Sequence, residues 1–251
     1  GISNSKTIDC NENGYFSIFQ SDRFGFNNPD EEWDQQEIEY LLVGDSFTQG
    51  SCVNRPNDLG SVLRTFSNKS VLNLGYAGNS LLVEYATLRE YLRPNVKNVL
   101  WLYYEGNDIG GLSAEFKSSI LTNYLKDLNF TQNLKFKQNK INEMTSKMIL
   151  DEKEIQSNLS LNIINVLKFY QIRDLISDFI HKDEYHLKPK PQSQFKKIIK
   201  MTNDLVTKNG SKLYFIYLPE HSRYVLNYDN LNYLLVKNIV SELNIPFIDI
   251  H

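Results

Sequence analysis

Short apolar runs alternate with helical segments along this chain, and this alternation constrains the fold more than any other feature of the sequence. Five runs have the length and composition of buried strands: residues 40–43, 70–74, 98–104, 212–218 and 246–250. Helices are predicted between them at residues 57–66, 81–91, 192–207 and 230–243. Strands that alternate with helices form parallel sheets with right-handed crossovers. The sequence therefore predicts an α/β fold with a mainly parallel five-stranded sheet.

Two segments lie outside this alternation. Residues 1–37 are rich in Asn, Asp and aromatic side chains, with turn signals at residues 24–30, and are predicted to form an irregular N-terminal arm that packs on the domain. Residues from about 113 to 182 are polar and helical, which predicts a helical insertion or lid with a solvated face. Because no internal repeat or second domain is visible, we expect residues 1–251 to form a single domain.

The composition limits the classes of partner. The 251 residues are 41% hydrophobic, which is enough for a substantial core, and the formal net charge of -3 argues against nucleic acid or an anionic membrane surface. No stretch approaches the roughly 18 to 20 apolar residues that a membrane span needs. The chain begins with Gly1 and not with Met, which leaves room for an upstream signal or anchor. An extracytoplasmic or cell-envelope location is favoured over a cytoplasmic one, and the oligomeric state stays undetermined.

Cysteine and histidine are too sparse to indicate a metal site or a cofactor, and we expect neither. Cys10 and Cys52 are too few for a disulfide scaffold and too far apart for a metal knuckle. A bridge between them would tie down the arm, and two unpaired thiols are the alternative that the sequence leaves open. His181 and His186 stand near acidic residues, but no compact set of three or four ligands is present, so an exposed helix end is favoured.

Polar groups follow the first three predicted strands at the points where these strands end. Ser46 follows the first run, Gly78 the second and Asn107 the third. In a parallel sheet all three ends lie at one edge, where open α/β sheets bind their ligands. Acyl transfer needs a nucleophile and donors that face the developing oxyanion. A serine hydroxyl, two backbone N–H groups and an asparagine amide at this edge supply both requirements.

These segments resemble a known family. Gly44-Asp45-Ser46-Phe47, Ala77-Gly78-Asn79-Ser80 and Gly106-Asn107-Asp108 are similar, in order and placement, to the motifs of the SGNH (GDSL-type) hydrolases and acyltransferases. The resemblance implies a flavodoxin-like three-layer α/β/α sandwich. It also implies that Ser46 is the nucleophile, and that its N–H, the Gly78 N–H and the Asn107 amide form the oxyanion hole.

The arm and the insertion indicate which branch of the family the chain resembles most. The segment from Phe24 to Pro29, together with the helical insertion, looks most like bacterial members linked to cell-surface polysaccharide O-acylation. The implied function is a serine esterase or O-acyltransferase that acts through a Ser46 acyl-enzyme. Its expected substrate is a small-molecule or polysaccharide ester, with acetyl as the expected acyl group.

The chain departs from the family pattern in two places. Glu105 stands where the family has Gly, and the chain ends at Asp249-Ile250-His251, where the family has Asp-x-x-His after its fifth strand. Because this spacing is one residue short, we expect that His251 is not the general base and that the family's last block lies beyond it. His221 is predicted to be a substrate contact or a surface residue. Asp108 is expected to brace its turn, rather than to pair with Glu105 in glycoside cleavage.

Two other functions compete with acyl transfer. One is a catalytically inactive SGNH-like module that keeps the cleft in order to bind a polysaccharide or a protein partner. The other is a phosphate-binding doubly wound domain in which Ser46 only caps a helix. The second is disfavoured because the chain has no Gly-rich loop of the expected form.

Overall fold

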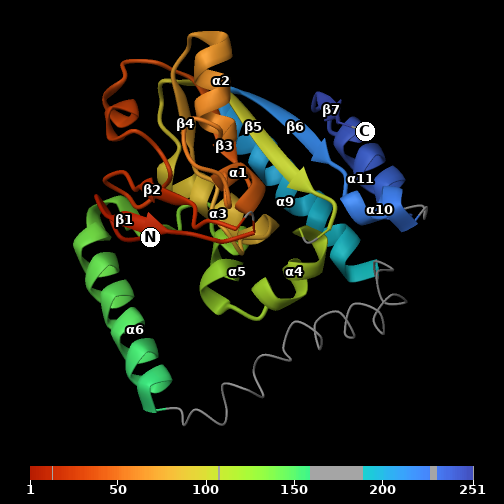
Figure 1. Cartoon of the computed structure of the whole chain (residues 1–251). Helices are drawn as coiled ribbons and strands as arrows, with labels where there is room; N and C mark the ends of the chain where they lie inside the picture. The colour runs from red at the N-terminus through yellow and green to blue at the C-terminus, as the bar shows by residue number, and fades with distance from the viewer. Residues whose placement is uncertain (13, 107, 159–188, 227–230, 251) are drawn as a thin grey trace.

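The computed structural model describes residues 1–12, 14–106, 108–158, 189–226 and 231–250, and a parallel β-sheet lies at its centre (Figure 1). The strands are β3 (Ile38–Val43), β4 (Val71–Asn73), β5 (Val96–Tyr104), β6 (Lys212–Leu218) and β7 (Phe247–Asp249). Their order is β4-β3-β5-β6-β7, and every neighbouring pair is parallel. This order confirms the predicted α/β class and the flavodoxin-like sheet.

Helices cover both faces of the sheet, as a parallel sheet requires. The described helices are α1 (Ser46–Gln49), α2 (Leu59–Ser67), α3 (Leu81–Tyr91), α4 (Asp108–Glu115), α5 (Ser119–Lys126), α6 (Gln138–Asn158), α9 (Pro189–Lys208), α10 (His221–Leu226) and α11 (Leu231–Glu242). Helices α3, α9 and α11 pack on one face, and α2 packs on the other over β3 and β4. None of the described helices is both long and apolar enough to cross a membrane.

Alternating side chains along the strands divide the core into two clusters. Val43 and Trp101 face α3, α9 and α11 in the larger cluster, whereas Leu42 and Leu102 face α2 in the smaller one. The helix α2 begins where Asp58 accepts a hydrogen bond from the backbone N–H of Ser61 at 3.0 Å, which caps its first turn. The two core clusters, one on each face of the sheet, therefore follow from the alternation of side chains along the strands.

The N-terminal arm packs on the domain, as predicted, but it is not wholly irregular. It contains a short antiparallel ladder of β1 (Lys6–Ile8) and β2 (Ile18–Gln20), followed by the 3-10 helix η1 (Asp30–Asp34). Phe26 and Trp33 are buried in the larger core cluster, and the Phe26 ring lies 5.0 Å from the Tyr91 ring. Strands of three residues without apolar alternation give no sequence signal, which explains the difference.

The helical insertion is described in part. Residues 113–158 contain the end of α4, then α5, the 3-10 helix η2 (Leu134–Lys137) and α6, which extends away from the sheet (Figure 1). The remainder of the predicted insertion, residues 159–182, lies outside the described residues. The same is true of His181 and His186.

Candidate active site

Ser46 lies at the carboxyl edge of the sheet, at the point where the strand order changes direction. From β3 the chain first runs to β4 on one side and then to β5 on the other, so the ends of β3 and β5 flank the crevice where such sheets bind ligands. Ser46 is the first residue of α1 and is half-buried. Within the described chain, neither its hydroxyl nor its backbone N–H donates a hydrogen bond to another residue. No described residue therefore accepts a hydrogen bond from either group.

The turn before Ser46 requires a glycine. A Cβ atom at Gly44 would lie 2.1 Å from the Thr48 hydroxyl oxygen and 2.8 Å from the Leu102 carbonyl oxygen. Asp45 then caps α1, since its carboxylate accepts a hydrogen bond from the Phe47 N–H at 3.0 Å. This close approach packs the serine turn directly against β5.

Hydrogen bonds connect the Ser46 turn to the loop that carries Gly78. The Tyr76 N–H donates to the Gly44 carbonyl at 3.2 Å, and the Ala77 N–H donates to the Gln49 side-chain carbonyl. Gly78 is exposed with φ of +82°, and its N–H donates to no residue of the described chain. The structure thus brings two of the predicted site residues, Ser46 and Gly78, to neighbouring turns whose N–H groups have no partner among the described residues.

A network of asparagines behind these turns was missed in the sequence. The Asn73 amide donates to the Thr48 carbonyl, and Asn73 exchanges two 2.8 Å hydrogen bonds with the side chain of Asn28. Asn27 donates to the Gln49 carbonyl at 2.9 Å. The arm segment 24–29, noted in the sequence for its turn signals and its resemblance, therefore braces α1 and β4. Its adjacent asparagines before a proline were the available signal.

Two buried carboxyl groups lie behind the edge. Glu84 accepts a 2.6 Å hydrogen bond from the Trp101 indole, and Asp108 accepts a 2.7 Å bond from the Tyr104 N–H. The second carboxyl oxygen of each has no partner among the described residues. Burial raises the pKa of both side chains well above the usual range, and the negative charges of neighbouring carboxylates, Asp45 among them, raise it further. Asp108 thus braces its turn through its hydrogen bond to the Tyr104 N–H.

Glu105 joins β5 to the elements beside it. Its carboxylate accepts hydrogen bonds from the Tyr217 hydroxyl at 2.7 Å and the Glu220 N–H at 2.8 Å, and it pairs with Arg223 at 3.2 Å. Its φ angle is not positive, so the backbone here does not require the glycine of the family pattern. These contacts assign Glu105 a structural role rather than the role of an acid partner to Asp108.

The structure does not supply every group that the predicted site needs. Asn107 and His251 lie outside the described residues. The described histidine, His221, is exposed at the start of α10. It follows β6, two strands from β3, a lateral separation of about 10 Å. The described part of the chain therefore places no general base beside Ser46.

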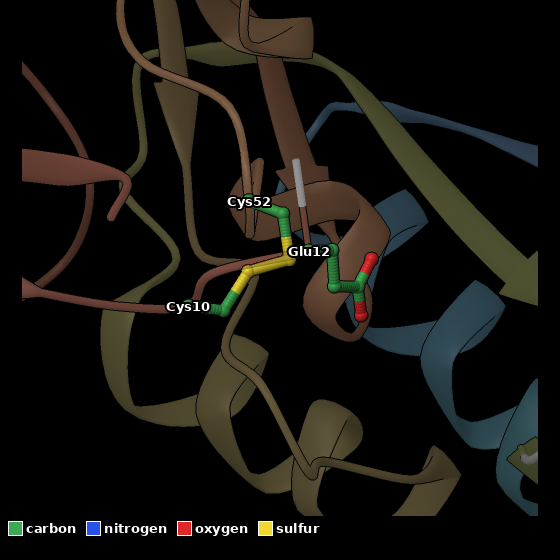
Figure 2. Close-up of side chains that lie close together, drawn as sticks. All are labelled: Cys10, Glu12 and Cys52. Atoms are coloured by element: carbon green, nitrogen blue, oxygen red, sulfur yellow. A yellow bond between two sulfur atoms is a disulfide. The ribbon is translucent and has the colours of Figure 1, made fainter. Parts of the chain in front are cut away.

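Cys10 and Cys52 form a disulfide, with their Cα atoms 5.0 Å apart (Figure 2). The bond links the arm to the loop that follows α1, which decides the question that the sequence left open. The Glu12 carboxylate lies beside the bond, within 4.8 Å of both sulfur atoms. Because the sulfurs are bonded to each other, they are not the thiolates that a metal would need.

No protein-family model matches this chain, and no curated protein matches it. Among solved structures, the crystal structure of a protein from Lactobacillus plantarum matches with 10% sequence identity and a TM-score of 0.37. The match covers 86% of this chain and 78% of the other. A similarity at that level carries no argument about function.

Proposed function

We propose that this protein is a serine esterase or O-acyltransferase of the SGNH type, acting on an acyl ester of a carbohydrate. One observation carries the proposal. The half-buried Ser46 hydroxyl and the N–H groups of Ser46 and Gly78 lie at the same edge of the sheet, and none of them donates to the described chain. A nucleophile beside unpaired backbone donors is the arrangement that acyl transfer requires.

The proposed reaction has two steps. The Ser46 oxygen bonds to the ester carbonyl carbon, a base takes the hydroxyl proton, and the Ser46 and Gly78 N–H groups stabilise the resulting oxyanion. The bond to the alcohol oxygen then breaks, and the proton passes to that oxygen. The oxygen of water or of a second sugar hydroxyl then bonds to the acyl carbon and gives its proton to the base. The bond between the acyl carbon and the Ser46 oxygen breaks, and the proton passes to that oxygen. No described residue is assigned as the base.

The Cys10–Cys52 bond supports an extracytoplasmic location for this reaction. Disulfides form and persist in oxidising compartments and are rare in the reducing cytosol. A location outside the cytoplasm is also where esters of cell-surface polysaccharides are found. The bond therefore agrees with a carbohydrate ester as the substrate.

A catalytically inactive binding module is the second candidate, and the position of His221 favours it. That side chain is exposed and follows β6, a strand about 10 Å from β3 across the sheet, so it is not placed beside Ser46 as a base would be. In such a module the edge would bind the same carbohydrate without cleaving it.

Labelling with a fluorophosphonate, together with turnover of an aryl acetate, separates the two candidates. The protein in its full natural length is compared with Ser46→Ala and with Ser119→Ala, a matched control in which an exposed serine also begins a helix. The esterase proposal expects labelling and turnover in the parent and in Ser119→Ala, and loss of both in Ser46→Ala. If the parent is neither labelled nor active, the binding module remains.

A further inference from the structure

A cavity of about 210 Å³ opens beside the Gly78 loop, between the N-terminal arm, α3 and the start of α6. Tyr76 and Asn79, which flank Gly78 closely in the sequence, both line it. The acyl-transfer chemistry proposed for Ser46 does not use this cavity.

Aromatic rings form much of the cavity wall. Phe24, Phe26 and Tyr91 line it and pack edge to face, with centroids 5.5 Å apart for Phe24–Tyr91 and 5.0 Å apart for Phe26–Tyr91. Tyr76 adds a fourth ring that is 38% exposed. A wall of fixed rings offers flat apolar faces, on which the C–H face of a sugar ring packs well.

Gln138 provides a buried amide oxygen that has no partner among the described residues. Its side chain lines the cavity and is only 9% exposed. Its Nε2 group donates to the Gly1 carbonyl at 3.0 Å and to the Asn142 side-chain oxygen at 2.9 Å, which fixes the orientation of the amide. Its Oε1 atom accepts no hydrogen bond from any described residue. A buried acceptor left unpaired destabilises the protein, so this oxygen favours a ligand that donates a hydrogen bond.

The cavity lining also limits the charge and the size of the ligand. None of its side chains is acidic, basic or imidazole, and burial lowers the pKa of the Gly1 α-amino group that also lines it, which disfavours the charged form of that group. The volume is below the roughly 300 Å³ at which pockets for drug-sized ligands begin, which suits one ring. An alkyl chain would fit the aromatic wall but would leave the Gln138 oxygen unpaired.

We propose that this cavity binds one neutral sugar ring, with a ring hydroxyl donating to Gln138 Oε1 and a ring face packed on Tyr76. The inference rests on the proposed function only in identifying this ring as part of the carbohydrate ester or of the acceptor. The hydrogen-bonding and packing requirements come from the cavity itself.

The test is saturation-transfer NMR and titration with methyl glycosides of glucose, galactose, mannose, rhamnose and N-acetylglucosamine, with butyrate as the acyl-chain probe. We expect at least one glycoside to bind, and its affinity to fall about tenfold or more in Gln138→Leu and in Tyr76→Ala. Tyr76→Phe keeps the ring and should retain the affinity. Tyr224→Ala, which removes an exposed tyrosine on α10, should also retain it.

Two results would overturn the proposal. One is the failure of every glycoside to bind. The other is binding that Gln138→Leu and Tyr76→Ala leave unchanged. If butyrate binds and no glycoside competes with it, the cavity would instead be identified as an acyl-chain site. Fluorophosphonate labelling of Ser46, measured on the same samples, distinguishes the two proposals: labelling without sugar binding refutes only the sugar site, and sugar binding without labelling refutes only the esterase.

Discussion

Glu115 caps α3 from a different helix, and its removal tests how the Gly78 loop is held. Its carboxylate accepts hydrogen bonds from the backbone N–H groups of Ser80 at 2.9 Å, Leu82 at 2.9 Å and Val83 at 3.4 Å. Ser80 is the N-cap residue of α3, but its own side chain makes no cap hydrogen bond. A carboxylate at this end of an 11-residue helix also interacts favourably with the helix dipole. The helix start that follows Gly78 therefore depends on Glu115.

The expected loss of stability in Glu115→Ala follows from these hydrogen bonds. A hydrogen bond to a charged group contributes about 1.5–3 kcal/mol, and loss of an N-cap residue costs about 0.5–2 kcal/mol. With two bonds of good length and a third that is weak, Glu115→Ala should lower the free energy of unfolding by about 2–4 kcal/mol. Glu115→Gln keeps an acceptor oxygen but loses the charge, so its loss should be about half as large.

Urea denaturation, followed by circular dichroism and tryptophan fluorescence, measures these differences. Glu242→Ala is the matched control, because it removes a carboxylate whose ion pair with Lys196 is exposed, with side-chain exposures of 58% and 50%. Such a pair contributes about 1 kcal/mol or less. A loss below about 0.5 kcal/mol in Glu115→Ala, or equal losses in the Ala and Gln variants, would refute the capping role.

Three further changes test the structure behind the site. Gly75→Ala should destabilise the protein by about 1–3 kcal/mol in urea denaturation, because its Cβ would lie 2.4 Å from a backbone nitrogen of α1. Glu84→Gln and Asp108→Asn should become more stable relative to the parent as the pH rises from about 4 in thermal melts, because burial raises the pKa of both carboxyls. The Cys10→Ser/Cys52→Ser double variant should lose up to about 4 kcal/mol in urea, because the bond closes a loop with a separation of 42 residues.

The direction of the pH effect follows from proton binding. A carboxyl with a raised folded-state pKa holds its proton when the unfolded chain has released it, so its stabilising contribution is complete below the unfolded pKa and is lost as the pH rises through the folded pKa. A pH-independent difference in stability between parent and variant would contradict the raised pKa of these two carboxyls. Wild-type stability in Gly75→Ala would contradict the close packing at α1. If a reductant left the free energy of unfolding of the parent unchanged, that result would contradict the disulfide.

Local patterns predicted much of the sheet. The run 212–218 coincides with β6, and the segment 81–91 coincides with α3, because each is bounded by turn or capping residues that act locally. The position of Ser46 at the end of β3 followed from the same kind of signal. The residues that end such elements lie next to them in the chain, so one sequence is enough to find them.

Long-range contacts could not be predicted in this way. The role of Glu105 depends on Tyr217 and Arg223, more than 100 positions away in the chain. Similarly, Glu115 caps a helix that begins 34 positions earlier, at Leu81. The cavity beside Gly78 needs the arm, α3 and α6 together. These features arise from packing between distant segments, which residue patterns do not encode.

The central claim is that Ser46 is the nucleophile, and a trapped acyl-enzyme tests it most directly. The protein in its full natural length is mixed with an aryl acetate, quenched in acid within the first turnover, digested and analysed by mass spectrometry. We expect one acetyl group on the peptide that contains Ser46, its absence in Ser46→Ala and its persistence in Ser119→Ala. Turnover with no acetyl group on that peptide, or with the group on another residue, would contradict it.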